Sequence, residues 1–275
     1  MVRIPSIFHF IFGLKPQHEP FHICWYLCLK SCIEVNRPEK IYFHYLNEPH
    51  GPWWEKIKGQ LLLLQLKDSA TYFDASLYDD HEEGAFIKKE NLQYAHQSDI
   101  LRLQILAEYG GVYADIDTLF VKPYPGDFYE FPCLMGRENA SLDPMTLCNA
   151  VIMAEKDSRF VTVWLQRMFE VFDGTWNRHS CIEPAILSQE LKDHIRLVSP
   201  EWFFHFTYSR EDLISLFGQV SKVPERVCSI HMWNHLWWDE RRTDFISFHG
   251  GHITEEFIQT VDNTYNIIAR RYLNQ

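Results

Sequence analysis

The sequence predicts an α/β fold in which a mostly parallel central sheet is flanked by helices. Segments rich in β-branched and aromatic residues alternate with segments of helical periodicity, and parallel strands need such helical crossovers. The chain has 275 residues, 46% of them hydrophobic and 23% charged. It is therefore long enough to bury a large core, and its composition is too balanced for a disordered chain. We expect one domain over residues 1–275.

The first three elements form one strand, helix and strand unit. The segment Ile4–Phe12 has the composition of a central strand and stops at Gly13. A helix is expected over Glu19–Val35, before the turn signal Asn36-Arg37-Pro38. A second strand is expected over Ile41–Leu46.

The alternation then continues and weakens. A short helix around Trp53–Lys58 precedes the apolar run Leu61–Leu64 and the segment Thr71-Tyr72-Phe73. Beyond Pro123 the residues predict mostly loops, with helices at Phe160–Phe172, Glu183–Asp193 and Ile253–Tyr272. Because open parallel sheets bind ligands beyond the carboxyl ends of their strands, functional residues are expected at that edge.

Charge and cysteine content exclude several classes of protein. The formal net charge of −11 argues against a protein that binds nucleic acid or an anionic membrane through its overall charge. Seven cysteines are an odd number in a large chain, so a disulfide framework is not expected. Cys24, Cys28 and Cys32 would share one helix stripe, either as buried thiols, which we favour, or as metal ligands. No stretch reaches the roughly 18–20 apolar residues of a membrane span. The apolar start Ile4–Leu14 is interpreted as a strand rather than a signal peptide.

The segment from Ser98 to Lys122 contains the residues that we expect to be functional. Its first half predicts an amphipathic helix that ends at Gly110-Gly111. Asp99 and Arg102 would lie on one face near the start of this helix, and in an arbitrary protein such a pair is usually a surface ion pair worth a few tenths of a kcal/mol.

Two carboxylates follow the helix. The run Val112–Asp117 predicts a buried strand, in which Asp115 and Asp117 point the same way while Ile116 packs behind them. Two like charges so close need a cation between them, and carboxylate oxygens favour Mg²⁺ or Mn²⁺, which could hold a diphosphate. A single Asp-X-Asp is weak support for this, but its combination with the helix and the Gly-Gly break is more specific.

On these residues the sequence resembles glycosyltransferase family 32, whose members carry an Asp-X-Asp sugar-binding region. The family includes α-1,4-galactosyltransferases, α-1,4-N-acetylglucosaminyltransferases and initiating mannosyltransferases of the yeast type. The matching segments follow the family order from the first strand to near the end of the chain: Ile4–Phe10, Ser98–Arg102, Tyr109–Asp117, Lys122-Pro123, Asn149-Ala150 and Ile230–Asn234.

The resemblance implies a GT-A fold, the Rossmann-like fold of nucleotide-diphospho-sugar transferases. It implies that residues 1–123 form the nucleotide-sugar-binding half, and that residues 124–275 form the acceptor side and a C-terminal closing segment. The implied reaction is a retaining, divalent-metal-dependent transfer of a hexose from a nucleotide sugar to a glycan or glycolipid hydroxyl. A UDP-sugar is the favoured donor, GDP-mannose is possible, and Mn²⁺ or Mg²⁺ is the implied cofactor.

The resemblance also assigns roles to individual residues. Arg102 would stabilise the departing diphosphate, a diphosphate oxygen would act as the base, and Phe10 and Phe12 would lie at the nucleobase or simply in the core. The implied catalytic residues are Asp115, Asp117 and Arg102; the implied donor-binding residues are Phe10, Phe12, Asp99, Arg102, Asp115 and Asn149; the implied metal ligands are Asp115, Asp117 and His231.

Some segments stay open. The family often has Thr-Gly-Pro where this chain has Cys181-Ile182-Glu183-Pro184, which leaves the acceptor side undefined. The loop Trp176–Ser180 could contact substrate or simply carry a Trp anchor. His231 and His235, with His249 and His252, have spacings compatible with zinc, although close pairs are expected by chance among 14 histidines. Trp233, Trp237 and Trp238 could be sugar platforms or core.

Two other functions are compatible with the same residues. A metal-dependent phosphohydrolase could use Asp115, Asp117 and the histidines, but it leaves Asp99 and Arg102 unexplained. A carbohydrate-binding protein without catalysis is the other alternative. Such a protein would not need both carboxylates together with Asp99, Arg102 and His231. A cytoplasmic location is expected, with the Golgi lumen as the alternative for a chain whose anchor was removed.

Overall fold

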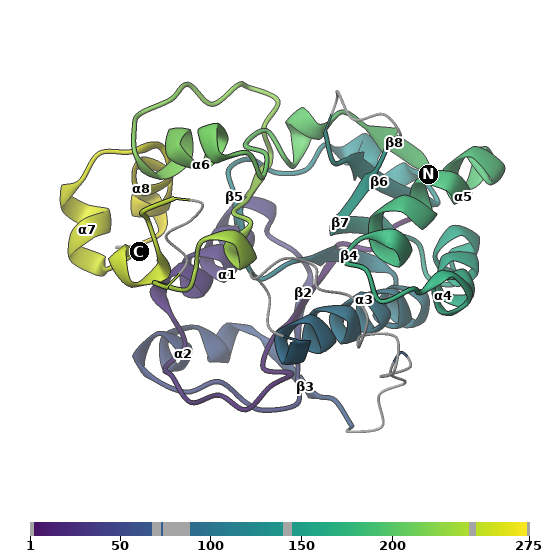
Figure 1. Ribbon diagram of the computed structural model, residues 1–275, viewed down its shortest axis with the longest axis horizontal. Coiled ribbons are helices and arrows are strands. Elements are labelled where there is room, and N and C mark those ends of the chain that lie inside the picture. Colours follow the sequence, from purple (N-terminus) through teal and green to yellow (C-terminus); the bar gives the residue numbers. More distant parts are fainter. Residues whose placement is uncertain (1–2, 68–72, 74–88, 140–144, 242–245, 274–275) are drawn as a thin grey trace.

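A seven-stranded mixed sheet forms the centre of the computed structural model, which describes residues 3–67, 73, 89–139, 145–241 and 246–273 (Figure 1). Its strand order is β3-β2-β1-β4-β7-β6-β8. The strands are β1 (Ile7–Ile11), β2 (Lys40–Tyr45), β3 (Leu62–Gln65), β4 (Gly111–Ala114), β6 (Cys133–Arg137), β7 (Leu147–Ala154) and β8 (Arg196–Val198). A separate two-stranded sheet pairs β5 (Thr118–Phe120) with β9 (Ser229–His231).

The sheet is mostly parallel, as predicted. Strand β1 lies between β2 and β4 and is parallel to both, and β6 is parallel to β8. Strand β7 is antiparallel to both β4 and β6. The predicted α/β class with helices on the faces of the sheet is therefore confirmed, with β7 as the strand that breaks the parallel order.

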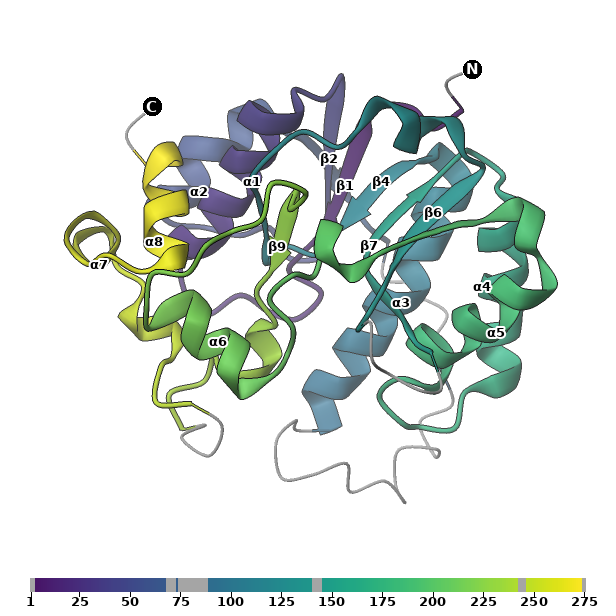
Figure 2. The ribbon, with the colours of Figure 1, turned by 90° about the horizontal axis from the view of Figure 1, so that it is seen from above.

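Helices cover both faces of the sheet (Figure 2). Phe8 and Phe10 of β1 face one core, together with helices α1 and α8, whereas Ile11 faces a second core, together with α3 and α4. This alternation is the two-residue repeat of a strand buried on both sides. The helices are α1 (Ile23–Asn36), α2 (Pro52–Ile57), α3 (Lys89–Tyr109), α4 (Arg159–Val171), α5 (Glu183–Glu190), α6 (Arg210–Phe217), α7 (Glu255–Thr260) and α8 (Thr264–Ala269).

The second half of the chain is more regular than predicted. The loops expected beyond Pro123 include β6, β7 and β8. The helix expected over Ile253–Tyr272 is interrupted, because α7 ends at Thr260 and the side chain of Asn263 caps a new helix, α8, by accepting the N–H of Asn266 at 2.7 Å. Of the predicted segment Thr71-Tyr72-Phe73, the first two residues lie outside the described residues.

The cysteines are buried and unbridged. All seven are free thiols, which confirms that no disulfide framework exists. Cys24, Cys28 and Cys32 belong to the core under α1, and burial raises the pKa of the Cys28 and Cys32 thiols well above its usual range. They act as small apolar side chains.

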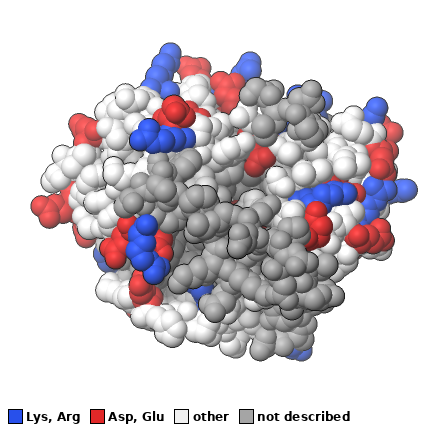
Figure 3. All heavy atoms as spheres, in the orientation of Figure 1, with Lys and Arg blue, Asp and Glu red and all other residues white. Residues whose placement is uncertain are grey.

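On one face of the protein, the charged side chains of the described residues are mixed in sign. On the face in Figure 3, Lys and Arg lie among Asp and Glu wherever described residues are visible. None of the described helices is both long and apolar enough to span a bilayer.

Two glycines join α3 to β4. Gly110 and Gly111 both have positive φ, 66° and 109°. A Cβ on Gly111 would lie 2.4 Å from the carbonyl oxygen of Ile7, so the close approach of β4 to β1 requires a glycine there. The predicted Gly-Gly break is confirmed, and it starts the strand that leads to the two carboxylates.

A buried histidine pair lies on the α3 face of the sheet. His9 Nδ1 and His44 Nε2 are 3.1 Å apart, and His9 Nε2 lies 2.9 Å from the carbonyl oxygen of Gly110. The rings of Tyr42 and Tyr109 pack against His9. Burial lowers the pKa of His9 to about 4 and, together with the charge of His9, that of His44 to about 3.

We predict that this pair destabilises the protein in acid. Because both folded-state pKa values lie below the usual 6.5, the stability from the neutral pair is complete above that pH and is lost as pH falls towards 4 and then 3. The loss between about pH 7 and pH 4 should be on the order of 3 kcal/mol for each histidine. Urea denaturation at these two pH values should show a smaller acid-induced loss in His44→Gln than in the wild type. An equal loss in both proteins would contradict the assignment.

Candidate active site

Asp115 and Asp117 lie in the turn that joins β4 to β5. Strand β4 ends at Ala114, and the N–H of Thr118 donates to the carbonyl oxygen of Asp115 at 3.0 Å. The prediction of a continuous strand over Val112–Asp117 is therefore wrong in its last three residues. The carboxylates still converge, but a turn brings them together rather than the alternation of a strand.

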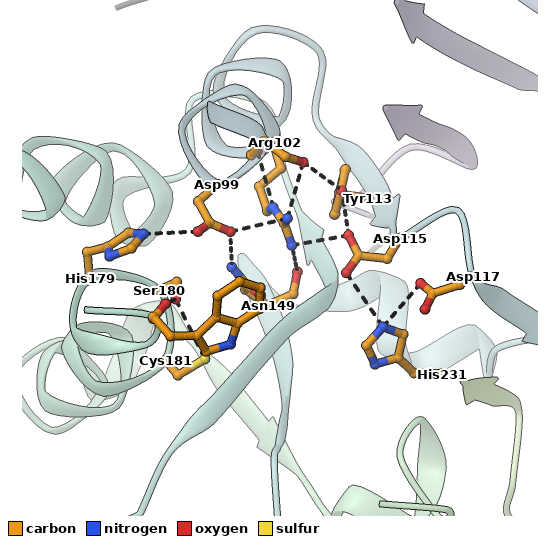
Figure 4. Close-up of polar contacts among 12 residues, drawn as sticks. Asp99, Arg102, Tyr113, Asp115, Asp117, Asn149, His179, Ser180, Cys181 and His231 are labelled. Carbon is orange, nitrogen blue, oxygen red and sulfur yellow. Dashed lines mark hydrogen bonds and ion pairs between the residues drawn. The ribbon is translucent and has the colours of Figure 1, made fainter. Parts of the chain in front are cut away.

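His231 is the residue on which both carboxylates converge (Figure 4). Its Nε2 lies 3.2 Å from Asp117 Oδ1 and 3.6 Å from Asp115 Oδ2. The pairing of β5 with β9 places it there, because Thr118 is the register partner of His231. The backbone N–H of Asn234 donates to Asp117 Oδ2 at 2.9 Å, which fixes the second oxygen of this carboxylate.

The pKa values of the two carboxylates are shifted in opposite directions. Burial opposes ionisation of Asp117, but the charge and hydrogen bond of His231 and the N–H of Asn234 outweigh it and lower the pKa of Asp117 to about 2. Burial raises the pKa of Asp115, and the charges of Arg102 and His231 offset this only in part. Burial lowers the pKa of His231, but the Asp117 carboxylate outweighs this effect and the net pKa is raised.

A buried guanidinium links this group to α3. Arg102 Nη1 lies 3.2 Å from Asp115 Oδ1, and its Nη2 lies 3.2 Å from Asp99 Oδ1. The side chains of Arg102 and Asp99 are only 6% and 9% exposed, so the surface ion-pair alternative is wrong. The prediction that they lie near the start of the helix is also wrong, because α3 begins at Lys89.

Asn149 of β7 completes the arrangement around Arg102. Its side-chain Nδ2 donates to Asp99 Oδ1 at 2.7 Å, and its carbonyl oxygen accepts from Arg102 Nη1 at 2.8 Å. The hydroxyl of Tyr113 donates to Asp115 Oδ1 at 2.6 Å, and the guanidinium lies over the Tyr113 ring. Of the predicted site residues, the structure thus brings together Asp99, Arg102, Asp115, Asp117, Asn149 and His231.

His179 also belongs to this group, although its role was left open by the sequence. Its Nε2 lies 2.9 Å from Asp99 Oδ2, and its side chain is fully buried. In the sequence, the only indication of a role for His179 was its place in the segment Trp176–Ser180, which contains polar and aromatic residues but no motif.

The sequence of the surrounding region matches a known family. Residues 29–133 match the family model described as glycosyltransferase sugar-binding region containing DXD motif. This part of the chain is therefore similar to a glycosyltransferase family. The family consists of enzymes, and the GT-A-type fold predicted from the resemblance agrees with the mixed sheet described above.

Two curated relatives are similar to this chain. "Glucan organizing enzyme 1" of Cryptococcus neoformans var. grubii is 34% identical over 215 residues, which cover 73% of this chain and 54% of that protein. "Subversion of eukaryotic traffic protein A" of Legionella pneumophila is 35% identical over 81 residues, 27% of this chain and 12% of that protein. The chain thus spans about half the length, or less, of these curated relatives.

Solved glycosyltransferase structures are similar at lower identity. The PaToxG glycosyltransferase has a TM-score of 0.46 and 18% identity, with 69% of this chain and 70% of that chain covered. The apo-form glycosyltransferase GlyE of Streptococcus pneumoniae has a TM-score of 0.49 and 11% identity, with 98% of this chain and 60% of that chain covered.

Two groups of side chains among the described residues could hold a metal ion. One consists of Asp115, Asp117 and His231, and the other of His96, Asp99 and His179, with the ligand atoms of each group within 4.8 Å of one another. The histidines with zinc-like spacing, His235, His249 and His252, belong to neither group. His249 instead accepts the N–H of Gly251 at the start of a short 3₁₀ turn.

The two phenylalanines expected at the nucleobase lie in an aromatic region of β1. Phe10 is fully buried and packs edge to face on Phe120. Phe12 is partly exposed and packs against Phe21 and Trp25, with ring centroids 5.2 and 4.7 Å apart. Their part in donor binding stays a prediction.

We predict that Arg102→Met destabilises the protein strongly. The substitution leaves the buried Asp99 carboxylate and the partly buried Asp115 carboxylate without their shared cation, which should cost about 3–5 kcal/mol of the free energy of unfolding. Urea denaturation measures this loss. Arg3→Met is the matched control, because its ion pair with Glu155 is at the surface, with the arginine side chain 48% exposed, and little change is expected there. A similar small loss in both variants would contradict a buried electrostatic role for Arg102.

Proposed function

We propose that this chain transfers a hexose from a nucleotide sugar to a hydroxyl of a glycan or glycolipid, with a divalent metal ion and with retention of the anomeric configuration. A UDP-sugar is the favoured donor, and GDP-mannose is the alternative. The observation that carries the proposal is the buried chain of alternating charges from Asp99 through Arg102 and Asp115 to His231 and Asp117.

The residues present fit a divalent ion. Asp115, Asp117 and His231 offer two carboxylates and an imidazole within a small space, and Nδ1 of His231 is buried without a hydrogen-bond partner in the part of the chain that the structure describes. Carboxylates suit Mg²⁺ and Mn²⁺, while imidazole suits the transition metals better than Mg²⁺, so the mixed set favours Mn²⁺. When bound, such an ion would neutralise negative charge on a diphosphate.

Arg102 and Asp99 would then act on the donor. The guanidinium is buried and held on opposite sides by Asp99 and Asp115, so it is already oriented before a diphosphate approaches. A preoriented cation in a low-dielectric site can stabilise developing charge by several kcal/mol. Asp99 would accept hydrogen bonds from the hexose hydroxyls.

The contacts of Asp115 and Asp117 support retention of the anomeric configuration. Asp115 is engaged by Arg102 and Tyr113, and Asp117 by His231 and the N–H of Asn234. With both carboxylates committed in this way, a diphosphate oxygen of the donor is the proposed acceptor of the proton from the attacking hydroxyl.

A panel of nucleotide sugars tests the proposal directly. Each donor is incubated with and without Mn²⁺, and with and without a mixture of glycan acceptors, and release of nucleoside diphosphate is measured. We expect release from one donor that requires Mn²⁺ and increases with an acceptor. Release that is fast and independent of acceptor would favour the phosphohydrolase, and binding without release would favour a carbohydrate-binding protein.

We predict that Asp117→Asn lowers metal-dependent transfer by at least about 100-fold, because a neutral amide is a poor ligand and cannot balance a cation. The fold should remain intact, as circular dichroism and thermal unfolding would show. Asp127→Asn is the matched control, because Asp127 is exposed on a 3₁₀ turn before β6, and its activity should equal that of the wild type. Undiminished transfer by Asp117→Asn would exclude Asp117 as a metal ligand.

A further inference from the structure

The π-helical turn Arg178–Ile182, labelled η4, is rigidly fixed behind the site. The N–H groups of Cys181 and Ile182 both donate to the carbonyl oxygen of Asn177, at 2.9 and 3.0 Å. The indole N–H of the buried Trp164 donates to the carbonyl oxygen of His179 at 2.9 Å. Turns of this kind are rare and often occur at functional positions, and this one aims a single side chain, His179, at α3.

The imidazole of His179 makes one polar contact and is otherwise enclosed by rings. Its Nε2 lies 2.9 Å from Asp99 Oδ2, and Nδ1 has no hydrogen-bond partner among the described residues. The rings of Phe172 and His96 pack edge to face against it, with centroids 5.1 and 4.6 Å away. Among the described residues, Asp99 is thus the hydrogen-bond partner of this ring.

Asp99 is held by donors from three elements. Asn149 of β7 and Arg102 of α3 both engage Oδ1, and His179 of η4 engages Oδ2. Three donors in different directions fix the plane of a carboxylate, and Asp99 in turn fixes one side of the Arg102 guanidinium. Loss of the Oδ2 donor would free the carboxylate to rotate away from Arg102.

We infer that His179 is a positioning residue of the transferase, which orients Asp99 and, through Asp99, Arg102 for the hexose of the donor. The inference rests on the proposed function. It requires that His179 affects recognition and transfer of the hexose, which Asp99 would contact. Binding of nucleoside diphosphate with metal should change little, because Arg102 keeps its contacts with Asp115 and with the carbonyl oxygen of Asn149 when Asp99 moves.

Two substitutions separate the hydrogen bond from the shape of the ring. His179→Phe keeps a planar ring in the aromatic enclosure and removes the donor, whereas His179→Gln retains an N–H near the position of Nε2. We expect His179→Phe to lower kcat/KM for the nucleotide sugar by roughly 10- to 100-fold, and His179→Gln to restore most of it. The dissociation constant of the nucleoside diphosphate with Mn²⁺ should change by less than about twofold in both.

Matched controls exclude a loss of stability as the cause. His44→Phe removes another buried histidine, on β2 and outside this group, and should leave kcat/KM unchanged at a temperature where all variants are folded. The Mn²⁺ and Zn²⁺ content of each protein is also measured, since His96, Asp99 and His179 could instead bind a metal.

Each other outcome overturns the inference. Equal activity of His179→Phe and the wild type overturns the inference but not the proposed function. The same holds if nucleoside diphosphate binding weakens by the same factor as kcat/KM. A second metal equivalent that is lost in His179→Phe makes His179 a ligand rather than a positioning residue. A wild-type protein that binds no nucleotide sugar overturns the proposed function and this inference with it.

Discussion

The guanidinium of Arg102 is the group on which the rest of the site depends. It is buried between Asp99 and Asp115, which come from α3 and from the turn after β4. Burial opposes ionisation of both carboxylates, and the charge of Arg102 is the largest effect that lowers the pKa of each. One cation therefore balances two carboxylates that come from α3 and from the turn after β4.

The acidic side chains at the site give it a local negative charge. The chain has a net charge of −11, and its site combines the carboxylates of Asp99, Asp115 and Asp117 with one guanidinium and one histidine of raised pKa. The described group therefore retains negative charge, which a divalent ion would balance. A cation held in this way would let an acidic protein approach an anionic diphosphate.

The sequence predicted the structure best where local composition alone determines the backbone. The strand and helix at the start of the chain and the Gly110-Gly111 break follow from local composition, and they are present. Strand β7 was missed because its residues are almost continuously apolar, and periodicity does not distinguish such a run from a buried helix. His179 was left unresolved because its partner Asp99 lies 80 residues away, and only the fold brings them together. The position of His231 came from the family resemblance, since nothing local pairs it with Asp117.

The turn after β4 shows why the precise backbone matters. In a continued strand, side chains two residues apart would project about 6–7 Å from each other along one face. The turn instead lets Asp115 and Asp117 both approach one imidazole, and it releases the chain into β5. Strand β5 then pairs with β9, which carries His231, so the C-terminal part of the chain supplies the third member of the group through backbone hydrogen bonds. The complete group therefore depends on the pairing of β9 with β5 as much as on the Asp-X-Asp motif itself.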